Sequence, residues 1–282
     1  MLALTPFIAA LAWAGLDALR KHLSHHVAPR ALAVALLVGQ VPLFAALLAA
    51  DGGWVRDPAY FLPGTLVALS NAAATLLFLR SVRLAPLNLT IPLLSLTPAL
   101  SAAIALPLLG ELPEPLALVG VAAVVGGALA LGWRRGGPSL RDHRRGALLM
   151  TSVAVLWSCG VALDKLALAS ADVSFHALYI TGVGALLLGA LLLARREAAQ
   201  LRPLASHLPA YLSALALLGV ALVAQLVAFT ITEVAVVETL KRALGMVFAV
   251  VFGRVFFAEN VTRRDLGVIA LMIAGTALII LG

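Results

Sequence analysis

The sequence predicts an all-α integral membrane protein of ten transmembrane helices, arranged as two inverted repeats of five helices. Hydrophobic residues make up 62% of the 282 residues and charged residues only 12%, whereas about a quarter of the residues are charged in a typical soluble domain. The mean hydropathy is +1.06. Since one spanning helix needs roughly 20 apolar residues, this length allows about ten spans with short loops and almost no extramembrane domain.

Apolar runs alternate with short segments that are polar or rich in Pro and Gly, and each run predicts one helix. The helices are expected near residues 5–23, 30–50, 62–80, 86–109, 115–133, 147–169, 173–194, 208–230, 235–257 and 264–281. The first run has no basic segment before it and no small-residue cleavage site after it. It is therefore expected to be a retained helix and not a signal peptide.

The two sides of the basic segment 134–146 resemble each other. Trp13 and Lys21 near the end of the first expected helix are matched by Trp157 and Lys165 in the sixth, 144 positions later in both cases. The spacing between the tryptophan and the lysine is thus preserved. A repeated pattern of this kind indicates a duplication of the five-helix unit.

A second motif recurs at the end of the fourth helix of each half. Leu-Leu-Gly-Glu at 108–111 corresponds to Phe-Phe-Ala-Glu at 256–259, and a Gly-rich helix follows each. Because five is an odd number, the two halves must cross the membrane in opposite directions, as in many secondary transporters. We expect a first repeat at 1–133, a basic connecting loop at 134–146 and a second repeat at 147–282.

These features together resemble the paired EamA domains of the drug/metabolite transporter (DMT) superfamily: a leading helix with Trp13, the segments 108–111 and 256–259, and a Gly-rich fifth helix in each half. The resemblance covers essentially the whole chain and rests on the order and duplication of the motifs. It implies a central cavity lined by the first, third, fourth, sixth, eighth and ninth helices. It implies no particular substrate, since the superfamily moves amino acids, drugs, sugar phosphates, nucleotide sugars and lipid-linked sugars.

The basic residues predict the orientation in the membrane. Fifteen of the twenty Lys and Arg residues fall in the expected loops of one face, Arg20 and the central loop included, and only Arg56 and Lys165 fall on the face that holds both termini. Cytoplasmic loops carry the excess of Lys and Arg. We therefore expect a bacterial inner-membrane protein with its central loop in the cytoplasm and its termini outside, although EamA-type proteins commonly have both termini in the cytoplasm. The net charge of +7 is then explained by basic loop residues that set the topology and contact lipid head groups, and it does not indicate nucleic-acid binding.

Ionisable side chains inside a span cost roughly 3 kcal/mol each and usually mark a pathway or a binding site. Glu238, Lys241 and Arg242 lie about a third of the way along the ninth helix. The resemblance adds that this Lys-Arg pair looks like the phosphate-binding pair of sugar-phosphate translocators. Alternatively, Glu238 pairs with both cations along its own helix and neutralises them. The matching positions of the first half are Leu93 and Leu94, so the duplication alone does not explain the charges.

Other polar residues within the spans are weaker candidates. Asp17 is a candidate for carrying a coupling proton, or for pairing locally with Arg20 and Lys21. His176 and Tyr179 begin the seventh helix, where we expect them to anchor the helix at the interface. The remaining candidates for a substrate site can hydrogen-bond or stack, and each has helix packing as an alternative role: Asn71, Thr90, Gln225, Trp13 and Trp157.

The expected function is a secondary transporter of a small metabolite, working by alternating access through a cavity between the repeats. The Lys241-Arg242 pair favours an anionic or zwitterionic substrate, and coupling to protons or to a counter-substrate is left open. The alternative is a flippase or carrier for a lipid-linked phosphate or sugar. A membrane-embedded enzyme is disfavoured, because the sequence has no HExxH, no Gly-x-Ser-x-Gly, no paired intramembrane aspartates and no clustered His ligands. No cofactor and no metal are expected.

Overall fold

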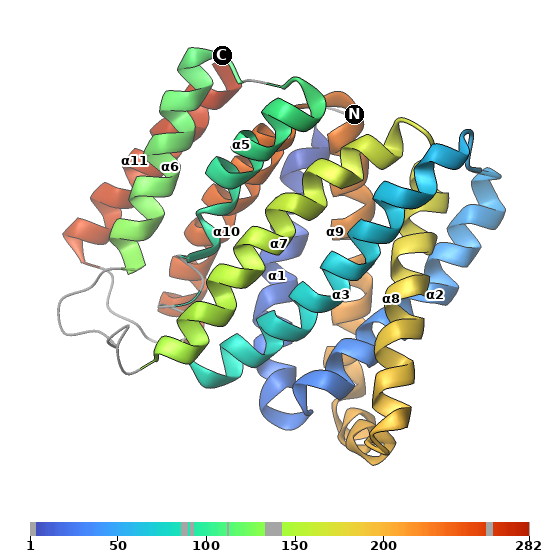
Figure 1. The fold of residues 1–282 in the computed structure, drawn as a ribbon. Helices are drawn as coiled ribbons and strands as arrows, with labels where there is room; N and C mark the ends of the chain where they lie inside the picture. Colours follow the sequence, from blue (N-terminus) through green and yellow to red (C-terminus); the bar gives the residue numbers. More distant parts are fainter. Residues whose placement is uncertain are drawn as a thin grey trace.

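The computed structural model describes residues 4–85, 90, 93–111, 113–132, 143–257 and 262–281. In this part of the chain, ten long helices account for nearly all of the structure (Figure 1). The first half contains α1 (Thr5–His26), α2 (Pro29–Asp51), α3 (Phe61–Leu84), α5 (Thr97–Leu109) and α6 (Pro115–Gly132). The second contains α7 (Arg144–Leu168), α8 (Val173–Ala194), α9 (Leu208–Ile231), α10 (Val234–Phe257) and α11 (Arg263–Leu281). The 3₁₀ segments η2 (Pro58–Tyr60) and η3 (Ala198–His207) precede α3 and α9. The all-α prediction is confirmed.

Among the described residues, five helices are long and apolar enough to cross a membrane: α2, α3 with η2, α7, α8 and α9 with η3. Shorter apolar stretches lie in α5, α6 and α11. The first helix, α1, carries Asp17, Arg20 and Lys21 close together, and α10 carries the charges predicted for the ninth span. Neither of these two helices is among the five.

The helices begin and end where local chemistry predicts. Proline, whose missing N–H costs nothing in a first turn, occupies the first or second position of α1, α2, α5 and α9. The first helix of the bundle continues to His26, three residues beyond the expected end. Gly110 ends α5 in the left-handed conformation with φ of +71° and donates its N–H to the Leu106 carbonyl, which is the usual role of glycine after a helix.

The fourth expected helix, 86–109, is interrupted. Leu93 and Leu94 are helical, a turn follows at Ser95 and Leu96, and α5 begins only at Thr97. Pro98 has no N–H to donate to the Leu94 carbonyl. The Oγ1 atom of Thr97 donates to that carbonyl instead, so the break leaves no unpaired acceptor there. Residues 86–89, 91 and 92 of the expected helix lie outside the described residues.

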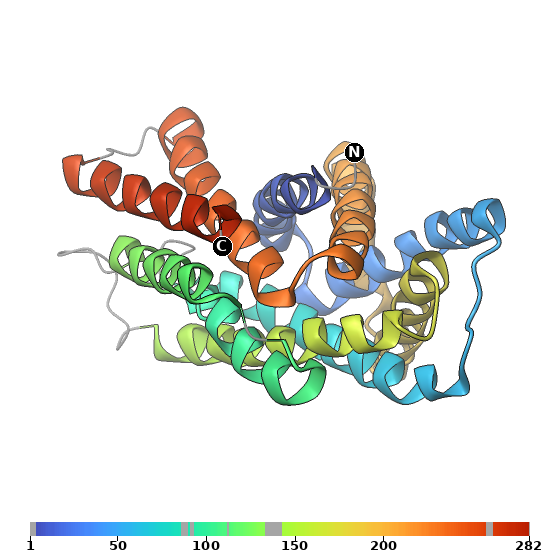
Figure 2. The ribbon, with the colours of Figure 1, turned by 90° about the horizontal axis from the view of Figure 1, so that it is seen from above.

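The two halves interlock. The most extensive contacts are those of α3 with α7, α6 with α11, α1 with α9 and α2 with α8, and each pair takes one helix from each half (Figure 2). If the helices are numbered one to five within each half, helix two packs on helix two of the other half, and helix five on helix five. Helix one of each half packs on helix three of the other. A two-fold axis lying in the membrane produces this exchange, which agrees with the inverted repeat.

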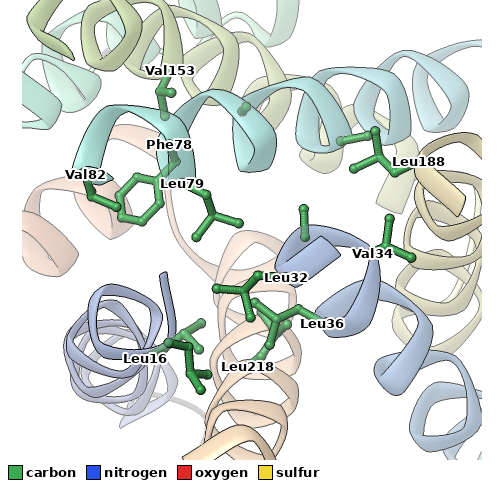
Figure 3. Packing of buried hydrophobic residues seen from close by; sticks show 14 of the residues in the cluster. Leu16, Leu32, Val34, Leu36, Phe78, Leu79, Val82, Val153, Leu188 and Leu218 are labelled. Carbon is green, nitrogen blue, oxygen red and sulfur yellow. The ribbon is translucent and has the colours of Figure 1, made fainter. Parts of the chain in front are cut away.

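The main apolar core lies where α1, α2, α3, α7, α8 and α9 meet (Figure 3). Leu16, Leu32, Phe78, Val153 and Leu218 come from five different helices and are at most 7% exposed. The Gly-rich fifth helices, α6 and α11, pack separately at one edge of the bundle. A Cβ atom at Gly275 would lie only 2.9 Å from the Gly120 carbonyl oxygen, so glycine permits this close approach.

Candidate functional site

A cavity of about 90 Å³ lies between the repeats, lined by α1, α2, α3, α7, α8, α9 and α10. One ordered water needs roughly 10–15 Å³ on the same measure, so the cavity can hold a small polar molecule. The resemblance implied lining by the first, third, fourth, sixth, eighth and ninth helices. Among the described residues, the second and seventh helices, α2 and α8, contribute, and the fourth, α5, does not.

The cavity brings together most of the predicted site residues: Trp13, Asp17, Asn71, Trp157, Gln225, Lys241 and Arg242. Glu238 does not line it but is fully buried directly beside Lys241 and Arg242. Thr90 is fully buried as well, and it is not one of the residues that line this cavity. The fold thus joins seven of the predicted residues in one place.

Lys241 is the most heavily bonded residue of the cavity. Its Nζ atom donates to Gln225 Oε1 at 2.7 Å and to Glu238 Oε1. The Arg242 Nη2 atom lies 3.7 Å from Glu238 Oε2. Because Glu238 precedes the two cations by three and four residues, all three side chains share one face of α10. The local pairing considered from the sequence is therefore present, but one carboxylate faces two cations, so the formal charges of the three residues sum to +1.

Trp13 and Trp157, which occupy equivalent positions in the two repeats, lie close to cationic side chains. Lys241 Nζ lies 5.4 Å and Arg20 Cζ 5.3 Å from the Trp13 ring centroid. Arg242 Cζ lies 5.9 Å from the Trp157 ring centroid. All three distances are within the range of cation–π attraction. Each repeat thus supplies one aromatic ring at the equivalent position, and each ring lies near at least one cation.

The structure places Arg20 inside α1. The sequence analysis was therefore wrong to count it among the loop residues of the basic face. Arg20 is 4% exposed and lines the cavity, because α1 continues past it to His26. Its Nη1 atom lies 3.4 Å from Asp17 Oδ1, so the local pairing considered for Asp17 is formed. This ion pair keeps the first-repeat side of the cavity close to neutral.

Three buried N–H groups of cavity residues have no hydrogen-bond acceptor among the described residues: Trp13 Nε1, Arg20 Nε and Arg242 Nε. Buried donors in proteins are nearly always paired, and leaving one unpaired costs free energy. On the acceptor side, Gln40 Oε1 of the same cavity and Glu238 Oε2 have no hydrogen-bond donor among the described residues. The cavity-lining residues thus carry three such donors and one such acceptor, so the site can bind a group with several acceptor oxygens.

The sequence analysis did not identify a buried hydrogen-bond network that lies next to the cavity. His176 lies between Asp164 Oδ1, 2.9 Å from its Nε2 atom, and the Tyr60 hydroxyl, 2.9 Å from its Nδ1 atom. His176 and Tyr60 are fully buried, so the expectation that His176 anchors the helix at the interface is wrong. A buried imidazole needs partners, and Asp164 and Tyr60 supply them. Tyr179 donates to or accepts from Thr65 Oγ1 at 2.8 Å.

The repeat could have identified Asp164 from the sequence. It lies 144 positions after Arg20, the same offset that relates the two tryptophans, and both residues line the cavity. The matched positions therefore carry opposite charges, a cation in the first repeat and an anion in the second. Gln40, by contrast, has no feature in the sequence that distinguishes it from a packing residue.

The comparisons with known proteins agree with this architecture. A protein known from a crystal structure superposes with a TM-score of 0.78, at 19% sequence identity, over 99% of this chain and 96% of that chain. No curated protein matches the sequence. The shared fold and the polar cavity between the halves define the molecule as a two-repeat helical membrane protein. Residues 1–133 and 144–281 both match the model of the EamA-like transporter family. The chain belongs to this family, and is thus a membrane transporter of the DMT superfamily.

Proposed function

We propose that this protein is a secondary transporter that moves a small anionic or zwitterionic metabolite by alternating access through the cavity between the repeats. The observation that carries the proposal is the group of unpaired buried donors, Trp13 Nε1, Arg20 Nε and Arg242 Nε, next to a cluster whose formal charges sum to +1. A carboxylate or phosphate would pair these donors. Arginine suits such a group because its planar fork matches two oxygens, and lysine adds a point charge.

A zwitterion fits the same cavity because acceptors also face it. Gln40 Oε1 is unpaired, and Asp164, whose Oδ1 atom is bonded to His176, is one of the lining residues. An ammonium group of the substrate would bind these acceptors while its acidic group binds the cations. Asn71 and Gln225 supply further hydrogen-bonding groups, and Trp13 and Trp157 supply ring faces for stacking. The cavity size favours a small soluble substrate over a lipid-linked one.

The proposed location is the inner membrane of a bacterium, with the central loop in the cytoplasm and the termini outside. The support is the excess of Lys and Arg in the loops of one face. Removing Arg20 from that count, since its side chain is buried and lines the cavity, leaves fourteen basic residues against two. The asymmetry persists, because the correction concerns one residue.

Uptake into proteoliposomes tests the proposal. The purified protein is reconstituted and offered a panel of labelled amino acids, dicarboxylates, sugar phosphates, nucleotide sugars and uncharged sugars, with and without a proton gradient. We expect saturable uptake of an acidic or zwitterionic compound, and weakened uptake by the Lys241→Gln/Arg242→Gln variant. Uptake limited to neutral or cationic compounds would contradict the anionic preference. Movement of lipid-linked sugars alone would favour the flippase alternative.

A further inference from the structure

Three histidines meet at the end of the bundle opposite the termini. His22 and His26 belong to the last two turns of α1, and His207 ends η3 directly before α9. One ring nitrogen from each lies within 4.8 Å of the others. The ring centroids of His26 and His207 are 4.1 Å apart, and that of His22 lies 5.1 Å and 6.1 Å from them. The sequence analysis did not identify this cluster, because His207 is far from His22 and His26 in the chain.

The cluster follows from the packing of the two repeats. His22 and His26 are four residues apart, so they project from the same face of α1. The first helix packs extensively against α9, and His207 immediately precedes α9. The cluster therefore joins residues that are about 180 positions apart in the chain, one pair from the first half and a single residue from the second.

His207 is already held in the tautomer that a metal ligand needs. Its Nδ1 atom lies 3.0 Å from the Pro203 carbonyl oxygen. A carbonyl only accepts, so Nδ1 carries the proton and Nε2 keeps a free lone pair. Histidines that bind metals nearly always donate their other ring N–H in this way, which fixes the ring and raises the basicity of the ligand. This hydrogen bond is independent of the clustering and points to the same chemistry.

We propose that His22, His26 and His207 form a site for a divalent transition metal such as Zn²⁺, which ties α1 of the first repeat to the start of α9 in the second. Three imidazoles and one water are a common tetrahedral set for Zn²⁺, with Zn–N distances of about 2.0–2.1 Å. Ligand nitrogens in such a set are about 3.3 Å apart. The rings of His22 and His26 are exposed, so side-chain rotation closes the remaining distance without a change in the backbone.

A metal at this site would affect transport because its ligands lie on α1 and directly before α9. Both α1 and α9 line the substrate cavity, through Trp13 and Asp17 on one and Gln225 on the other. Alternating access requires the halves to move relative to each other. A metal bridging α1 and α9 holds these two helices together at one end and slows that movement. This consequence rests on the proposed transport function, whereas metal binding itself does not.

The first experiment measures binding. The full chain is purified in detergent without a polyhistidine tag and titrated with Zn²⁺ by calorimetry. We expect one Zn²⁺ per chain, at least a tenfold loss of affinity in His207→Gln and in His26→Gln, and no binding of Mg²⁺, which prefers oxygen ligands. His25→Gln is the matched control, because His25 is exposed on the same turn but does not belong to the cluster. Circular dichroism and size-exclusion chromatography confirm that each variant is folded.

Unchanged affinity in His207→Gln would overturn the proposal, since Zn²⁺ would then bind only the α1 pair. An equal loss in His25→Gln, or no binding by the unaltered protein, would overturn it too. The second experiment adds Zn²⁺ to proteoliposomes during uptake of whichever substrate the panel identifies. We expect slower uptake by the unaltered protein and by His25→Gln, and no effect on His207→Gln. Zn²⁺ that binds the three histidines without slowing uptake would refute the tie between the repeats while leaving the transport proposal intact.

Discussion

Lys241 in the second repeat faces Trp13 in the first, with its Nζ atom 5.4 Å from the ring centroid. The same Nζ atom is bonded to Gln225 of α9 and to Glu238 of its own helix. Lys241 therefore connects the charged face of α10 to the aromatic ring of α1 across the cavity. Residues of both repeats therefore meet at this lysine.

Replacing both cations should abolish tight binding of an acidic substrate. Two charge-assisted contacts are worth roughly 1.5–3 kcal/mol each, so we expect Lys241→Gln/Arg242→Gln to weaken affinity by about 100-fold or more. The change Arg242→Lys should weaken binding as well, since it removes the planar fork. The measurement is the substrate concentration that gives half-maximal uptake. Normal affinity in a well-expressed triple variant, with Glu238→Gln added so that no carboxylate is stranded, would contradict the anion site.

The ion pair between Lys165 and Glu111 should stabilise the face that holds the termini. The Lys165 ammonium also donates to the Thr232 carbonyl at 2.9 Å, and both side chains of the pair are at most 24% exposed. We expect Lys165→Gln to cost about 1–3 kcal/mol, seen as a lower melting temperature in detergent. Reversal of both charges, Lys165→Glu with Glu111→Lys, should recover part of the loss. The control is Arg56→Gln, whose pair with Asp172 is 58% and 42% exposed and should contribute less. An equal effect of the two single changes would contradict the ranking.

Glu233, in the connection between α9 and α10, should make stability depend on pH. Burial raises the pKa of this carboxyl above its ordinary value, and Glu111 raises it further while Lys165 partly offsets the effect. A raised pKa means that the ionised form is disfavoured in the folded state, so stability is lost as pH rises through the folded pKa. We expect Glu233→Gln to raise the melting temperature near pH 8, with a difference that narrows as the pH falls toward about 4. A lower melting temperature at pH 8 would show that the ionised form is favoured instead.

Orientation can be tested with single cysteines. The native Cys159 is first replaced by Ala, and a cysteine is then introduced into the segment 136–143 or added at the C-terminus. We expect an impermeant thiol reagent to label only the terminal cysteine in intact cells, and both after the cells are opened. The reverse pattern would place the central loop outside, as would be the case with both termini in the cytoplasm.

Substitution of Asp17 can distinguish a structural role of this residue from a role in proton coupling. Its contact with Arg20, a residue only 4% exposed, favours a structural role. We expect Asp17→Asn to lower the folded yield and melting temperature, because it leaves a buried cation without its partner. Uptake by the folded fraction should keep its response to a proton gradient, with Asp17→Glu as the control that retains the charge. Loss of that response in Asp17→Asn alone would identify Asp17 as the carboxylate that carries the coupling proton.

The sequence predicted the helices well because composition and proline placement act locally. Nine of the ten expected ranges lie within a few residues of the observed ones, and the interruption at Ser95 follows from a proline visible in the sequence. The pairing of Trp13 with Trp157 was also accessible, since the repeat fixes equivalent positions. Arg20 and His176 were misplaced because burial of a polar residue depends on partners from other helices. The approach of His207 to α1 depends on the packing of two halves, which no local pattern records.

The interlocked arrangement of the repeats affects how the chain is made in the cell. Since α1, α2, α3 and α6 have their largest contacts with helices of the second half, these faces stay uncovered after the first five helices leave the ribosome. At elongation rates of about 5–20 residues per second, the second half takes roughly 10–30 s to synthesise. Throughout this interval the faces that will contact the second half have no partner. The packing of the first half is therefore completed only when the second half has been made.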